Sequence, residues 1–69
     1  MTLRDFLATY TGFNFNAGEV VVIDQRMGKH YICEYKDGKL IHPFHEFKDE
    51  MQKEVYDWNH SAKTMLITL

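Results

Sequence analysis

The densest cluster of metal-ligand residue types in this chain is the segment 42–46, with the sequence HPFHE. Zinc sites combine His, Cys and carboxylate ligands at short spacings, and His30 or Cys33 from a neighbouring segment could complete such a set. However, the sequence has no Cys-x-x-Cys pair, and the spacing of the histidines matches no standard zinc pattern. A metal site at His42 and His45 is therefore one alternative. The simpler interpretation is a set of polar residues at a corner between two secondary-structure elements.

Cys33 is the one cysteine of the sequence, which excludes an intramolecular disulfide and is typical of a reducing compartment. A cysteine beside a histidine can act as a nucleophile. Here Cys33 alternates with Tyr31 and Tyr35, which predicts that all three share the core face of a strand, where a thiol is inert. The sequence also lacks a glycine-rich phosphate-binding loop. We therefore predict a protein that is not an enzyme, with no catalytic residue and no cofactor.

Acidic side chains are concentrated in one part of the chain, although the net charge is only −2. A run of charges usually forms a solvated face. The alternative is an acidic patch that binds a basic groove, such as the nucleic-acid channel of a nuclease. On a helix, residues 46, 49 and 50 would lie along one exposed stripe. The candidate partner-binding residues are Glu46, Asp49, Glu50, Glu54 and Asp57.

Basic residues gather near the predicted turns, and they are Arg26, Lys29, Lys36 and Lys39. Such turns could contact RNA or DNA while Tyr31 or Tyr35 stacks on a base. The weakly negative net charge does not provide the concentrated basic surface that phosphate binding requires. A nucleic-acid-binding module is therefore an alternative function, and direct nucleic-acid binding is not expected.

These candidate residues must be positioned by a small fold whose central element is the strand predicted at 19–25. Val20 to Ile23 are branched at Cβ and favour an extended backbone. A continuous apolar run is typical of a central strand that is covered by a helix. We expect that helix at the N-terminus, capped by Thr2 and ended by Gly12. Its apolar face follows the spacing i, i+3, i+4 and i+7 and comprises Leu3, Phe6, Leu7 and Tyr10.

The strand at 19–25 is expected to continue into an antiparallel meander over residues 19–42. Gly28 suits the first turn, and Asp37-Gly38 is a strong hairpin signal between returning strands at 30–36 and 39–42. In the connector before the meander, Phe13 and Phe15 are expected to fill the edge of the core.

The second half of the chain predicts a short helix and a hairpin. Pro43 suits the first turn of a helix over residues 43–52, and residues 53–69 read as a β-hairpin with a turn at 61–63. The strand Thr64–Leu69 is expected at a sheet edge, where free backbone groups could pair with a second copy. The sequence is therefore compatible with either a monomer or a homodimer.

The expected fold is α+β, with an N-terminal helix, a three-stranded antiparallel meander, a short helix and a C-terminal β-hairpin in a single domain spanning residues 1–69. One helix is expected to pack across an antiparallel sheet. A chain of 69 residues buries only roughly 60% of its unfolded surface, which makes self-association advantageous. The predicted core comprises Leu3, Phe6, Leu7, Val20, Val22, Tyr31, Cys33, Phe47, Val55, Leu66 and Trp58.

Segments at both ends of the chain resemble parts of known small proteins. The start, MTLRDFL, and the segments KEVYDW at 53–58 and KTMLITL at 63–69 resemble small proteins of bacteriophages and mobile elements of Firmicutes. These proteins run from a short N-terminal helix through a hairpin to a "(K/R)EV-x-x-(W/F)…L-x-I-x-(L/V)" hairpin. The similarity covers about a third of the chain. Some small phage proteins of this size inhibit host defence, including anti-CRISPR proteins that bind Cas9, so the resemblance implies a binder without chemistry.

The N-terminus has no signal-peptide pattern, and the sequence has no apolar run long enough for a membrane span. Together with the resemblance, this predicts a protein-binding module from a phage or mobile element that acts in the host bacterial cytoplasm. Its expected partner is a host protein, in the sharpest form a CRISPR nuclease such as Cas9.

Overall fold

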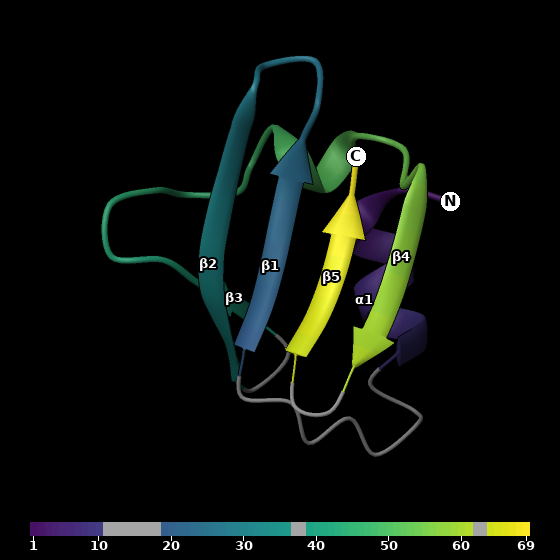
Figure 1. Cartoon of the computed structure of the whole chain (residues 1–69), viewed down its shortest axis with the longest axis horizontal. Coiled ribbons are helices and arrows are strands. Elements are labelled where there is room, and N and C mark those ends of the chain that lie inside the picture. Colours follow the sequence, from purple (N-terminus) through teal and green to yellow (C-terminus); the bar gives the residue numbers. More distant parts are fainter. Residues whose placement is uncertain (11–18, 37–38, 62–63) are drawn as a thin grey trace.

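The protein is a mixed five-stranded sheet with both of its described helical segments on one face (Figure 1). The computed structural model describes residues 1–10, 19–36, 39–61 and 64–69. In chain order the elements are helix α1 (Leu3–Tyr10), strands β1 (Glu19–Asp24), β2 (Lys29–Lys36) and β3 (Lys39–Ile41), the short 3₁₀ helix η2 (Glu50–Gln52), and strands β4 (Asp57–Ser61) and β5 (Thr64–Thr68). This confirms the expected α+β class, the meander and the C-terminal hairpin.

The strand order is β3-β2-β1-β5-β4, so the predicted central strand β1 is indeed in the middle. The sheet was expected to be antiparallel throughout, and this was wrong, because β1 pairs in parallel with β5. Between β3 and β4 the chain passes across the helix side of the sheet (Figure 1). The hairpin of β4 and β5 therefore returns beside β1, and β5 runs in the same direction as β1. The expected edge position of the strand from Thr64 was therefore wrong, since β5 lies between β1 and β4.

Strand β1 forms where β-branched residues favour an extended backbone. Its side chains alternate, with Val20, Val22 and Asp24 buried on the helix side and Val21 partly buried on the opposite face. The turn after it has Gly28 at a φ of 64°, a conformation that glycine adopts without strain.

Helix α1 docks on the sheet through its predicted apolar face. The Asp5 backbone N–H donates to Thr2 Oγ1 at 3.2 Å, which confirms the predicted cap. Leu3 and Leu7 are buried, and Phe6 lies against Trp58 with ring centroids 5.6 Å apart. The buried core comprises Leu3, Phe6, Leu7, Val20, Val22, Cys33, Phe47, Met65, Ile67 and Leu69.

Leu66 was wrongly placed in the predicted core. It is 36% exposed, whereas Met65 and Ile67 on either side of it are fully buried. The reason is the two-residue period of a strand, which turns Leu66 to the face away from α1. Tyr31 and Val55 pack against the core while only partly buried, and Trp58, which was also predicted for the core, is 50% exposed.

The helix predicted over residues 43–52 does not form along that length. Pro43 and Phe44 instead make a turn closed by an antiparallel bridge between His42 and His45, and only η2 is helical. Proline presets the backbone for the second position of a turn as well as for the first turn of a helix, so Pro43 fits both. Strand β4 also begins at Asp57, later than the predicted start at 53.

The segment before β4 is held mainly by the N-terminus, and it meets β5 only at Tyr56, whose N–H donates to the Thr68 carbonyl at 2.8 Å. The Leu3 N–H donates to the Lys53 carbonyl, and the Val55 N–H donates to the Met1 carbonyl, both at 2.9 Å. The predicted helix end at Gly12 and the predictions for 13–18, 37–38 and 62–63 lie outside the described residues. In the described part of the chain, the helical segments lack the length and apolar character that a bilayer crossing requires.

Candidate functional site

The two histidines proposed as metal ligands are the ends of one tight turn. His42 Nδ1 accepts a hydrogen bond from the Phe44 N–H at 3.2 Å, and His45 Nε2 pairs with the Glu50 carboxylate. The imidazole centroids are 6.3 Å apart and nearly perpendicular. Among the described residues, no three His, Cys, Asp or Glu side chains are grouped so that they could hold a metal ion. The histidines therefore organise the turn.

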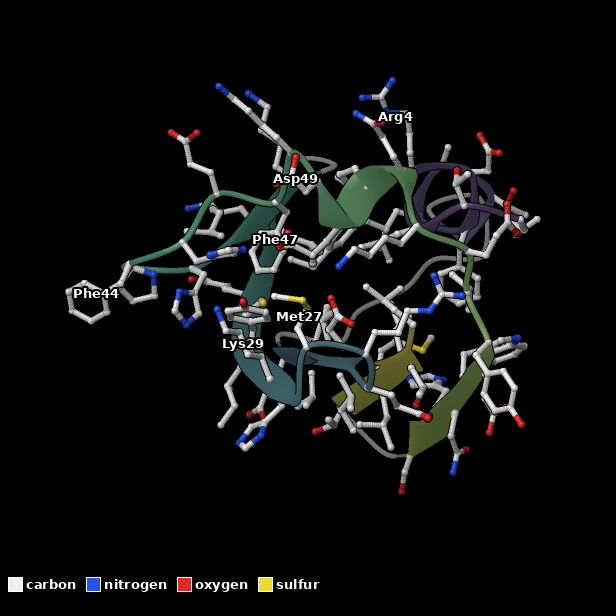
Figure 2. All side chains as sticks on the ribbon, turned by 90° about the horizontal axis from the view of Figure 1, so that it is seen from above. Arg4, Met27, Lys29, Phe44, Phe47 and Asp49 are labelled. Atoms are coloured by element: carbon white, nitrogen blue, oxygen red, sulfur yellow. The ribbon has the colours of Figure 1, made fainter. Side chains whose placement is uncertain are left out.

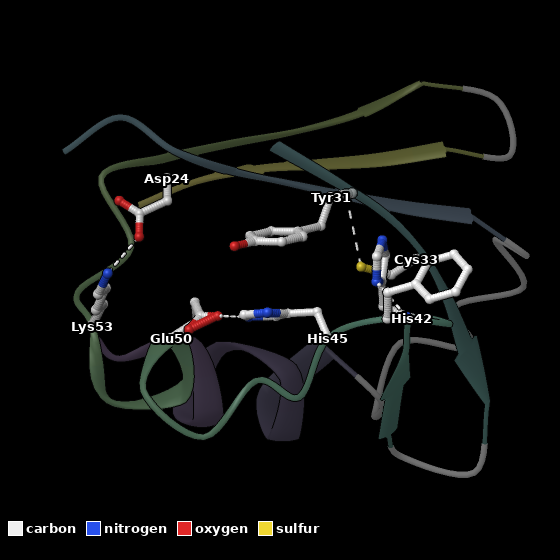
Figure 3. Close-up of polar contacts among 8 residues, drawn as sticks. Asp24, Tyr31, Cys33, His42, His45, Glu50 and Lys53 are labelled. Atoms are coloured by element: carbon white, nitrogen blue, oxygen red, sulfur yellow. Dashed lines mark hydrogen bonds and ion pairs between the residues drawn. The ribbon is translucent and has the colours of Figure 1, made fainter. Parts of the chain in front are cut away.

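His45 is the residue that fixes this turn to the rest of the protein. Its ring stacks on Tyr31 with centroids 4.3 Å apart and planes 18° from parallel, and Figure 3 shows it below Tyr31 with its outer end pointing at the Glu50 carboxylate. The edge of the Phe47 ring also meets Tyr31, with centroids 5.4 Å apart. The rings of Tyr31, His45 and Phe47, together with the Glu50 carboxylate, thereby join strand β2 and the turn to η2.

Phe44 projects from this supported turn into solvent. It is 92% exposed, the largest exposed fraction among the large apolar side chains described. Figure 2 shows its ring at the outer extremity of the turn, pointing away from the rest of the molecule.

The predicted acidic stripe is not assembled. Glu50 is buried against His45, because the segment does not form the helix that would have aligned it with Glu46 and Asp49. Glu46 pairs with Lys48 at 3.5 Å, and Glu54 pairs with the N-terminal amine at 2.5 Å. Asp49 and Asp57 are exposed.

Sequence reasoning missed an ion pair between the buried Asp24 and the partly exposed Lys53 (Figure 3). The hydrogen bond from Lys53 holds the pKa of the Asp24 carboxyl below its ordinary value of 3.8, against the desolvation that burial imposes. The same bond raises the pKa of Lys53 above its ordinary value. The available signal was the two-residue period of β1, which places Asp24 on the same face as Val20 and Val22.

Cys33 is buried, as predicted, and its thiol lies 3.7 Å from the Tyr31 carbonyl, to which it donates. Desolvation by burial raises the pKa of this thiol to about 11. A thiol of this kind is almost entirely protonated at neutral pH, and the thiolate is the nucleophilic form.

The two tyrosines that were candidates for stacking on a base are both engaged within the fold. Tyr31 is stacked on His45, and Tyr35 packs against the core, where desolvation raises the pKa of its phenol. Lys36 and Lys39 face each other in the β2–β3 pairing and are exposed.

The sheet face opposite α1 carries a line of apolar side chains. Ile32, Val21 and Leu66 lie side by side on strands β2, β1 and β5, because Val21 is the register partner of both other residues. Ile32 is 60% exposed. We call these three residues the open-face row, since α1 and η2 both lie behind the sheet in Figure 1.

Two carboxylates lie beside the open-face row. Glu19 is the register partner of Glu34, and like charges directly opposite each other repel. No ion pair with a described cation involves either residue. Together with Ile41 they help line a hollow of about 410 Å³.

Comparison of the chain with protein-family models, curated proteins and solved structures gave no match.

Proposed function

We propose that this chain is a non-enzymatic protein-binding module whose contact surface is the open sheet face. The observation that carries the proposal is the open-face row. Its most exposed member, Ile32, is 60% exposed, although the opposite face of the same strand packs into the core through Cys33. Contiguous exposed apolar side chains with a polar rim are typical of protein interaction sites. The adjacent Glu19 and Glu34 favour a partner that brings a basic side chain, because a cation between them would relieve their repulsion.

The sharpest form of the proposal is an inhibitor of a host defence nuclease. Two points support it: the resemblance of the chain ends to phage proteins, and the basic grooves that nucleases present to their substrates. In this form the protein originates from a phage or mobile element and acts in the host bacterial cytoplasm. Because Glu50 is buried and Glu54 is paired, the open face is a better contact surface than the acidic patch.

The experiment is binding to, and inhibition of, purified host nucleases, beginning with Cas9 loaded with guide RNA. The test variant combines Ile32→Ser with Leu66→Ser and removes apolar area from the open-face row. We expect its affinity to fall by about tenfold or more, equivalent to ~1.4 kcal/mol. The matched control is Met27→Ser in the β1–β2 turn, since Met27 is 59% exposed and lies outside the row.

Each outcome has a distinct meaning. Wild-type affinity in a folded double variant would overturn the open face as the contact surface. Absence of binding and inhibition across the panel would overturn the nuclease-inhibitor form. If Met27→Ser weakened binding as much as the double variant, the contact surface would have to include the β1–β2 turn.

A further inference from the structure

We propose that a hollow beside helix α1 and the turn at 42–45 is a docking site for an acidic, amphipathic segment of a protein. Such a segment has an aspartate or glutamate next to a large apolar residue. The hollow measures about 620 Å³, which is within the usual range of binding sites in proteins. It lies on the helix side of the sheet, away from the open-face row, and the inference is independent of the proposed function.

The floor of this hollow is apolar and firmly supported. Phe47 belongs to the buried core, and Leu40 and Met51 pack against that core while only partly buried. Apolar side chains that are left partly exposed at the bottom of a hollow gain free energy when another apolar side chain covers them. The occupant is therefore expected to bring a large apolar side chain.

The rim of the hollow has an excess of positive charge, although the whole chain has a net charge of −2. The charged residues that line it are Arg4, Lys39, Lys48 and Glu46. Glu46 pairs with Lys48 at 3.5 Å. Among the described residues, neither Arg4 nor Lys39 forms an ion pair with a carboxylate. Figure 2 shows the Arg4 side chain projecting outward from α1. Charge complementarity therefore favours an occupant with a carboxylate.

The shape of the hollow favours a segment of a protein over a small molecule. A small ligand is usually buried over roughly 70–90% of its surface, and this hollow is open to solvent. It is also continuous with the turn that presents Phe44, because His42 and His45 at the ends of that turn help line it. Phe44 is 92% exposed, and exposed aromatic rings and arginines are enriched in protein interfaces.

The turn beside the hollow is already fixed in the protein without a partner. His45 stacks on Tyr31 and pairs with Glu50, and His42 accepts a hydrogen bond from the Phe44 N–H. Binding therefore requires little ordering of this turn, and ordering is one of the main free-energy costs of association.

The test is a selection from a random heptapeptide library displayed on phage, with the immobilised full chain as the target. Before each round the library is depleted on a variant that combines Lys39→Glu with Lys48→Glu, two exposed positions on the rim. Peptides that bind the open-face row are removed in this step, because that surface is intact in the variant. We expect the retained peptides to converge on an acidic residue beside a large apolar residue.

A synthetic peptide with that consensus is then measured by fluorescence anisotropy against two further variants. Arg4→Glu should raise its Kd by about tenfold or more, and Phe44→Ser by about threefold or more. The wild-type Kd should also rise with salt concentration. Arg4 is exposed in the first turn of α1, where the helix dipole favours a carboxylate, so Arg4→Glu is compatible with the fold.

The matched control is Arg26→Glu, which makes the same change of charge at an exposed position of the β1–β2 turn, outside the hollow. It should bind the peptide like the wild type, and circular dichroism establishes that each variant is folded. A selection without a consensus, or a consensus without an acidic residue, would overturn the proposal. Equal binding to Arg4→Glu and the wild type would also overturn it, and an unchanged Kd for Phe44→Ser would exclude Phe44 from the site.

Discussion

Neighbouring residues on β5 provide a direct test of which face of the sheet is the core. Ile67→Ala and Leu66→Ala delete the same number of carbon atoms from adjacent positions on one strand. Ile67 is fully buried, whereas Leu66 is 36% exposed on the open face. The two substitutions therefore differ in burial while their chemistry is nearly the same.

The expected magnitudes follow from that burial. Removing about three methylene equivalents from the core forfeits roughly 2.4 kcal/mol of transfer free energy, and the residual cavity raises the destabilisation to about 3–4 kcal/mol. Leu66→Ala should lower the free energy of unfolding by only about 1 kcal/mol, because its side chain already contacts solvent. A domain of this length has a total stability of roughly 3–10 kcal/mol, so Ile67→Ala removes a large part of it.

The assay is urea unfolding followed by the fluorescence of the single tryptophan, with far-ultraviolet circular dichroism as the second probe. Trp58 is a suitable reporter because its ring lies against Phe6 of the docked helix. In thermal unfolding, the difference corresponds to a Tm for Ile67→Ala that is about 10 °C or more below that of Leu66→Ala. Equal destabilisation by the two substitutions would refute the assignment of β5 faces and, with it, the open-face row.

Glu50→Lys should lower the free energy of unfolding by about 3 kcal/mol, because it buries a cation at a position where a carboxylate is now paired with His45. Asp49→Lys, at an exposed position, should leave urea unfolding unchanged. Similar effects of the two substitutions would contradict the burial of Glu50. Cys33 should react with a thiol-specific chromogenic disulfide at pH 8 at least about a hundred times more slowly in the folded protein than in urea, and rapid native labelling would contradict its burial. The lowered pKa of Asp24 means that the folded state prefers its ionised form, so this contribution to stability is present above the ordinary value of 3.8 and is lost as pH falls through the lowered pKa. The raised pKa of Lys53 gives the opposite sign, with stability lost as pH rises through that pKa. Asp24→Asn should flatten the acid limb of a stability-versus-pH curve, and an unchanged limb would contradict the ion pair.

Local patterns in the sequence determined the elements whose spacing is regular. The face of α1 follows from the positions of Leu3, Phe6 and Leu7, and the β-branched run around Val22 determined a strand that is central in the sheet. The two-residue period of β2 correctly placed Cys33 in the core. These features depend on neighbours within one turn of helix or along one strand, so the sequence alone carries them.

Tertiary structure decided what depends on residues far apart in the chain. The parallel pairing of β1 with β5 joins Val21 to Leu66, and no local period encodes the direction in which a distant strand returns. It also decided which face of β5 meets the helix. Ile67 therefore lies in the core, where Leu66 had been predicted.

The candidate sites depended most on the tertiary structure. The sequence marks Asp24 and Glu50 only as charged residues, and both are buried because Lys53 and His45 lie within reach to pair with them. Desolvation of a charge is tolerated only where such a partner is supplied. The fold thus turned part of the predicted acidic contact surface into internal structure, and it left the opposite face of the sheet open.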